Sequence, residues 1–268
     1  MKKNRMSIVS VIALLLAMLC ACTKAENNSA SEKTNAENII RVGCEATTPG
    51  WIQTDENGKL SGYDYDVWME IGNRIGYKIE YRIMEWDGMW AMLNDKRLDS
   101  VGEQISYTDD RAKRYYMSEP YAYNIYSLLS RKNNKALQSM QDLKTGMTIS
   151  CEPNSSDEII LNAIKAEYNV ELKPLYFDGM SVQEVVLGRC DLWPRAKTSC
   201  LKTIEAIDGL MILGDTNIIE TNVYPFHKDE KGKELCALVS KAITEMRADG
   251  TLKKLSEKWF GMDVSVKP

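Results

Sequence analysis

The most constraining feature of the sequence is an alternation of short apolar segments with amphipathic ones along residues 147–213. Strands joined by helices pair in parallel, because a helical crossover returns the chain to the end of the sheet where the previous strand began. The alternation therefore predicts an α/β architecture. The predicted strands are 147–151, 170–175, 190–193 and 210–213, and the predicted helices are 156–167, 181–187 and 198–207.

The same texture begins at Ile39, where residues 39–44 predict a first strand. A helix follows from about Asp64 to Gly76, with apolar residues at intervals of three and four, and residues 77–83 alternate as a half-buried strand. A short helix is predicted at about 88–93, and an apolar stripe over 235–246 predicts a long one near the end. At about 100 to 200 residues per domain, this part of the chain has room for two sheets.

Residues 1–21 predict a signal peptide. Lys2, Lys3 and Arg5 form a positively charged start, and residues 8–19 form an apolar run that is too short to span a bilayer comfortably. This pattern predicts export.

The apolar run ends in LCAC, which resembles the lipobox of bacterial lipoproteins and implies that Cys22 becomes the lipidated first residue. An ordinary secretory signal, cut nearby, is the alternative. Residues 23–38 are polar and contain no aromatic or branched apolar side chain, so 22–38 are expected to form a flexible tether. Acyl chains would hold the protein at the cell membrane, facing the periplasm or the cell exterior.

The charge balance argues against a nucleic-acid partner. The chain has 38 acidic and 34 basic residues and a net charge of -4, so it lacks a strong positive field. His227 is the one histidine of the sequence, which excludes a multi-histidine metal site. We expect no metal, no cofactor and no catalytic residues.

The cysteines remaining after processing and lipidation number five, so at least one stays outside any intrachain pair. Cys44, Cys151 and Cys190 lie in strand-like apolar segments, where a thiol serves as a small buried hydrophobe. Export permits a disulfide without requiring one.

Six blocks of the sequence, in order, resemble family 3 extracellular solute-binding proteins, the polar amino acid receptors of ABC importers. These blocks are IRVGCEATTPGW, GKLSGYDYDVWMEIGNRIG, EWDGMWAMLNDKRLD, SYTDDRAKRYYMSEPY, LGRCDL and AITEMRADGTLKKLSEKWFG. The resemblance implies a two-lobe type II periplasmic-binding-protein fold, with two mixed, mainly parallel sheets flanked by helices and joined by two hinge strands. Residues 39–122 and 223–268 would form lobe 1, and 123–222 lobe 2, with a ligand between them.

The resemblance assigns the ligand's carboxylate to Arg111, because Arg111, in Thr108-Asp109-Asp110-Arg111, lies where the family has the arginine that binds the ligand's α-carboxylate. A guanidinium offers two parallel donors that match a carboxylate. Ser106 would add donors, and Ser155 and Ser156 would present a helix N-terminus from the other lobe. The structural alternatives are a surface arginine paired with a nearby aspartate and serines that only cap strand or helix ends.

Aromatic and acidic residues complete the expected pocket. Trp86 matches the family's stacking aromatic, and Trp51 is expected in the same wall, although a Pro-Phe pair is usual there. Glu45 and Glu152 are expected to face a cationic group of the ligand, and a solvated strand-end charge is the alternative for Glu45.

Three positions concern ligand identity. Gln104 matches the cystine-type branch, and its alternative is a structural amide. Ala196 stands where the family usually has an aspartate for the ligand's ammonium. Either Glu45 or Glu152 compensates, or the ligand is not a standard α-amino acid. Arg195 is a candidate second anion contact.

The resemblance thus implies a monomeric protein that binds a small carboxylate-bearing solute, an amino acid or a derivative, and delivers it to an ABC permease. A cyclohexadienyl-dehydratase-like enzyme on the same fold is an alternative, with Glu152 or Glu45 as its acid. A sensory receptor is another alternative.

Overall fold

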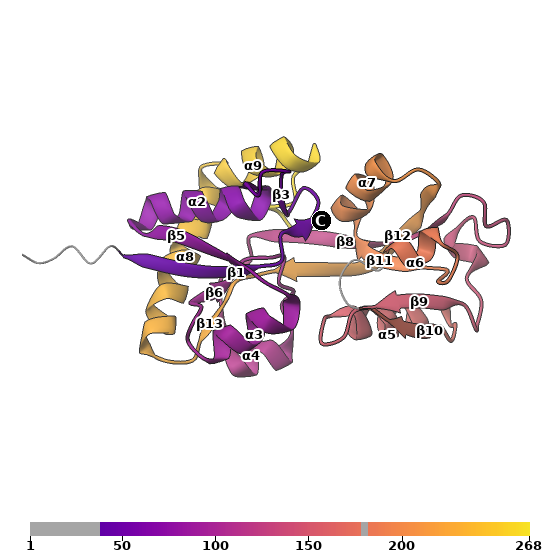
Figure 1. The fold of residues 1–268 in the computed structure, drawn as a ribbon, viewed down its shortest axis with the longest axis horizontal. Helices are drawn as coiled ribbons and strands as arrows, with labels where there is room; N and C mark the ends of the chain where they lie inside the picture. Colours follow the sequence, from indigo (N-terminus) through magenta and orange to yellow (C-terminus); the bar gives the residue numbers. More distant parts are fainter. Residues whose placement is uncertain (1–37, 178–181) are drawn as a thin grey trace, which may run out of the picture. The chain divides into compact units, whose positions relative to one another are not determined.

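The computed structural model describes residues 38–177 and 182–268 (Figure 1). The predicted signal peptide, the lipidation site Cys22 and the tether up to residue 37 lie outside this range. Within it, no helix is both long and apolar enough to cross a membrane.

The first sheet has the order β5-β1-β6 and is parallel throughout. Its strands are β1 (Ile39–Cys44), β5 (Lys78–Ile83) and β6 (Ser100–Val101). Helix α2 (Tyr63–Ile75) connects β1 to β5, after a small antiparallel sheet, and α3 (Trp86–Asn94) connects β5 to β6. The antiparallel sheet consists of β2 (Thr47–Thr48), β3 (Ile52–Thr54) and β4 (Leu60–Ser61).

Glycine is required where α2 begins. Gly62 has φ 130°, and a Cβ atom there would lie 2.2 Å from the carbonyl oxygen of Trp51. Gly62 is the N-cap, so the helix begins one residue before the predicted start at Asp64, and Asp64 is fully buried in the first turn. The helix ends at Gly76 in the left-handed conformation, as the sequence predicts.

The C-terminal segment returns to this first lobe. Strand β13 (Pro225–His227) pairs antiparallel with β7 (Tyr115–Met117), beyond the short helix α4 (Asp109–Arg114). Helices α8 (Glu230–Ala248) and α9 (Thr251–Phe260) both pack on α2, and all three contribute to one hydrophobic core. Early and late parts of the chain therefore fold together (Figure 1).

The second lobe has separate hydrophobic clusters. Strand β9 (Thr148–Cys151) pairs in parallel with β10 (Lys173–Tyr176), and α5 (Asp157–Tyr168) connects them. A parallel bridge joins Ile149 to Leu192, just before β11. The remaining helices are the 3-10 helix η1 (Met140–Asp142), α6 (Val182–Val186) and α7 (Lys197–Ala206).

Two long antiparallel strands connect the lobes. Strand β8 (Ala122–Arg131) pairs with β12 (Leu210–Asn222) on one side and with β11 (Trp193–Ala196) on the other (Figure 1). Their register runs from Ala122 opposite Asn222 to Arg131 opposite Leu210, with two irregularities in β12.

The two-lobe α/β fold is confirmed, but the pairing is more antiparallel than expected. The β11-β8-β12 sheet is antiparallel because both connecting strands run through it in opposite directions. Three predicted strands differ in extent: 170–175 lies at Lys173–Tyr176, 190–193 lies at Trp193–Ala196, and 210–213 continues to Asn222. The boundaries 39–122, 123–222 and 223–268 stay a prediction.

The five cysteines in the described part of the chain are free. Cys44, Cys151, Cys190 and Cys200 are buried, and Cys236 is partly buried. The prediction that Cys44, Cys151 and Cys190 are small buried hydrophobes is confirmed.

Candidate functional site

A pocket of about 810 Å³, including the part open to solvent, lies between side chains of the two lobes. Nine of the ten predicted ligand-binding residues line it, and Trp51 does not. The first lobe contributes Glu45, Trp86, Gln104, Ser106 and Arg111, and the second lobe contributes Glu152, Ser155, Ser156 and Arg195. Residues far apart in sequence are thus brought together in one pocket.

The guanidinium of Arg111 is buried, and few groups of the protein offset its positive charge. Helix α4 positions it, since the Thr108 hydroxyl accepts the backbone N–H of Arg111 at 3.2 Å. Its Nη1 donates to the carbonyl of Ser106 at 3.0 Å, and its Cζ lies 4.9 Å from the ring centroid of Trp90 and 5.6 Å from that of Trp86.

The side chain of Arg111 is therefore oriented without an acidic partner. Arg111 is only 8% exposed, and no carboxylate oxygen in the described residues lies within 4.0 Å of its nitrogens. Burial lowers its pKa, with the charge of Glu220 acting in the opposite direction. A buried cation of this kind favours an incoming anion.

Ser106 and Ser156 meet across the two lobes. Their hydroxyl oxygens are 3.1 Å apart. Ser156 is the N-cap of α5 but its side chain makes no capping hydrogen bond, so its hydroxyl is directed at the pocket. Ser155 instead donates to the carbonyl of Glu152 at 2.8 Å and accepts the N–H of Asp157 at 3.0 Å, which stabilises the turn.

Two glutamates form one acidic wall. One carboxylate oxygen of Glu103 accepts the N–H of Glu45, and the other accepts the Thr48 hydroxyl at 3.4 Å. Glu45 in turn accepts the N–H of Trp86 at 3.1 Å. Burial raises the pKa of Glu45 and, more strongly, that of Glu103. The sequence pointed to Glu45 but not to Glu103.

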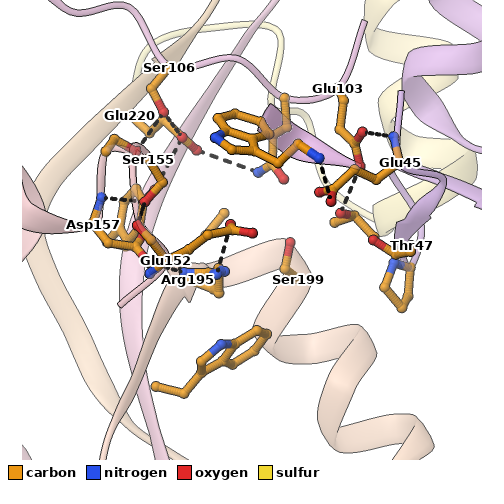
Figure 2. A pocket seen from close by; sticks show the side chains of 18 of the residues that line it. Glu45, Thr47, Glu103, Ser106, Glu152, Ser155, Asp157, Arg195, Ser199 and Glu220 are labelled. Atoms are coloured by element: carbon orange, nitrogen blue, oxygen red, sulfur yellow. Dashed lines mark hydrogen bonds and ion pairs between the residues drawn. The ribbon is translucent and has the colours of Figure 1, made fainter. Parts of the chain in front are cut away.

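Glu220 forms a second acidic position that sequence reasoning missed. It lies on β12 and is 7% exposed. Its carboxylate accepts the Ser106 hydroxyl, the Tyr126 hydroxyl at 3.2 Å and the Gln104 side-chain amide at 3.4 Å. Burial raises its pKa, which those hydrogen bonds partly offset. Figure 2 shows Glu220 beside Ser106 on one side of the pocket and Glu45 beside Glu103 on the other.

Arg195 lines the pocket but its charge is already paired. Nη1 contacts both carboxylate oxygens of Asp157, at 3.0 and 2.9 Å, and Nη2 lies 3.8 Å from Glu152 (Figure 2). Burial alone would lower the pKa of Arg195, but the charges of Asp157 and Glu152 raise it. The geometry does not support the expectation that Arg195 offers a free anion contact.

The remaining positions fall into two groups. Trp86 lines the pocket and its Nε1 has no hydrogen-bond partner in the described structure. Trp51 is instead fully buried in the core beside Tyr63 and Phe260, and its Nε1 donates to Thr198 at 3.0 Å. An aromatic residue after a strand fits either environment, and the sequence alone did not separate them.

Ser199 is a further lining residue that the sequence did not indicate. It is 3% exposed, its hydroxyl has no partner in the described structure, and Figure 2 shows it directed into the pocket. Ala196 also lines the pocket and offers only a methyl group there. No group of three metal-ligating side chains occurs in the described ranges.

The family model for bacterial extracellular solute-binding proteins, family 3, matches residues 40–262. The chain belongs to this family. As a member of an extracellular family it is an exported protein that binds a solute.

Relatives match over nearly the whole length. The probable amino-acid-binding protein YxeM of Bacillus subtilis is 32% identical, with 99% of this chain and 98% of YxeM covered. The L-cystine-binding protein TcyA of the same organism is 30% identical, with 99% and 100% covered. Among solved structures, an ancestral arginine-binding protein bound to arginine matches with 32% identity and a TM-score of 0.73, covering 84% of this chain and 99% of that one.

Proposed function

We propose that this protein captures a small carboxylate-bearing solute, an amino acid or a derivative, and delivers it to the permease of an ABC importer. The names of YxeM, TcyA and the arginine-binding protein support an amino acid as the ligand class. The pocket supports it too, because it combines several carboxylates with one guanidinium that has no acidic partner among the described residues. An amino acid carries both complementary charges.

The proposal rests on the hydrogen bonding of the buried Arg111 guanidinium. A guanidinium has five N–H donors, and within the described residues that of Arg111 makes a single hydrogen bond, to the Ser106 carbonyl. The ligand's carboxylate would accept the remaining donors, with the hydroxyls of Ser106 and Ser156 and the N-terminus of α5 beside it.

We propose that lobe 1 comprises 39–122 and 223–268, that 123–222 form lobe 2, and that ligand binding favours closure. Three side-chain contacts support closure around a ligand, since each joins the two lobes. They are Ser106 with Ser156, Trp51 with Thr198, and Asn154 with Asp87.

Residues 1–21 are proposed to be a lipoprotein signal peptide, with Cys22 lipidated and 22–38 as the tether to the membrane. The polar composition of that segment and the small residue before Cys22 support this. A monomer is sufficient, because one chain supplies both walls of the pocket.

The proposed role is binding without catalysis. Glu45 and Glu152 are the acids that a dehydratase on this fold would use. The carboxylate of Glu152 lies 3.8 Å from the guanidinium of Arg195, so it already makes an ion pair. Incubation of the purified protein with prephenate or arogenate is expected to give no product above the uncatalysed rate. Turnover would favour the enzyme.

A thermal-shift screen of the purified protein against amino acids, dicarboxylates and polyamines tests the proposal. A ligand at 100 times its Kd stabilises a protein by about 2.7 kcal/mol. We expect an amino acid to raise the Tm, and Arg111→Ala to remove that shift. Arg114→Ala, on an exposed arginine of the same helix that does not line this pocket, is the matched control and should keep it. A panel with no stabilising amino acid would contradict the proposal.

A further inference from the structure

The charged groups of the pocket are unbalanced. Arg195 is neutralised by Asp157 and Glu152. Within the described residues, no Lys or Arg nitrogen lies within 4.0 Å of the carboxylates of Glu45, Glu103 or Glu220. In the same described part of the chain, the guanidinium of the pocket that lacks an acidic partner is that of Arg111.

Ser106 places one of these acids next to the proposed carboxylate position. The carbonyl of Ser106 accepts from Arg111, and its hydroxyl donates to Glu220. In an α-amino acid the ammonium and the carboxylate are attached to the same carbon atom, so their binding groups must be close neighbours. Glu220 meets this condition, because Ser106 contacts both Glu220 and Arg111.

The two other acids are placed for a different group. Glu45 and Glu103 lie across the pocket from Glu220 (Figure 2). A cation bound there would be distal to the carboxylate and separated from it by the ligand's stem. The buried hydroxyl of Ser199, without a partner in the described structure, supplies an independent sign that the space between takes a polar ligand.

Building on the proposed function, we propose that Glu220 anchors the ligand's α-ammonium and that the preferred ligand is an α-amino acid with a second, distal cation. Glu220 thereby supplies from the β12 strand the negative charge that the methyl group of Ala196 does not. One carboxylate of the ligand meets Arg111, and its two cations meet the surplus acids.

Isothermal titration calorimetry of the purified full-length protein with L-lysine, L-glutamine and ε-aminocaproate tests both parts. The last compound is lysine without its α-amino group. We expect lysine to bind more tightly than glutamine, and more tightly than ε-aminocaproate by about ten- to hundredfold, the effect of one charge-assisted hydrogen bond. In Glu220→Gln the preference for lysine over ε-aminocaproate should fall to about threefold or less.

Glu45→Gln is the matched control. It removes a carboxylate from the opposite wall, so the affinities for lysine and ε-aminocaproate should change together and their ratio should stay that of the wild type. A Glu220→Gln protein that keeps the wild-type ratio would overturn the role of Glu220. So would a wild-type protein without preference for the α-amino group, a result that needs no variant to fold.

Different results would contradict the distal cation and amino acid capture. Tight binding of glutamine with weaker binding of lysine would overturn the distal-cation part and leave amino acid capture intact. Absence of binding for every amino acid in the thermal-shift panel would contradict the proposed function itself, and with it this inference.

Discussion

Arg111 and Arg195 lie in similar surroundings but differ in their acidic partners. Each lies near a tryptophan ring and each lines the pocket. Arg195 contacts two carboxylates, whereas Arg111 contacts one backbone carbonyl. A buried arginine with acidic partners supports the fold, and a buried arginine without them is available to a ligand. The pairing of a charge, more than its position, separates the two roles.

The largest expected effect concerns stability and comes from Arg195→Met. It leaves Asp157 without its cation, and Asp157 is 3% exposed. Breaking a buried ion pair on one side costs about 3 to 5 kcal/mol. Urea unfolding measures this. Arg189→Met, in an exposed pair with Glu184, is the control and should stay within about 0.5 kcal/mol. An equal loss in the free energy of unfolding for both variants would contradict a structural role for Arg195.

A second prediction concerns how stability and ligand binding depend on pH through the acids of the pocket. Burial raises the pKa of Glu45, Glu103 and Glu220 above the ordinary 4.5. The folded, ligand-free protein therefore holds protons that the unfolded chain has lost, and its stability should fall as pH rises above about 4.5. A cationic ligand favours the ionised carboxylates and releases those protons.

The affinity for a cationic ligand should therefore increase with pH, by at most about tenfold per pH unit for each proton released. Calorimetry at pH 5 and pH 8, in buffers of different ionisation enthalpy, measures the proton count. Glu220→Gln should reduce it. An affinity that falls as pH rises would contradict the assignment of these acids to a cation.

The smallest expected effect comes from Trp51→Phe. This change keeps an aromatic ring in the core beside Tyr63 but removes the hydrogen bond to Thr198 in the other lobe. A typical net hydrogen bond contributes about 0.5 to 1.5 kcal/mol. We expect a loss of that size in the free energy of unfolding and in ligand affinity, since the contact joins the lobes. An unchanged affinity would make the contact irrelevant to closure.

Where a motif carried the chemistry, the sequence pointed to residues that lie together in the structure. Arg111, Ser106 and Trp86 stand in blocks with recognisable spacing, and all three line one pocket. Helix and strand positions followed from apolar periodicity, as in α2 and β1.

What the sequence missed depends on distant contacts. Glu220 escaped notice because the irregularities in β12 interrupt the alternation after Ile212, so the strand seemed to end early. The pairing of Arg195 with Asp157 joins residues 38 positions apart, and no local pattern encodes it. Whether Trp51 faces ligand or core is decided by Phe260, at the other end of the chain.

The central claim is that Arg111 holds a ligand carboxylate, and the most direct measurement is a double-mutant cycle between protein and ligand. Calorimetry would compare the best-binding amino acid with its carboxamide, in the wild type and in Arg111→Ala. The amide should bind at least about tenfold more weakly to the wild type, with little further difference between acid and amide in the variant. The same loss in both proteins would show that another group binds the carboxylate and would contradict the account.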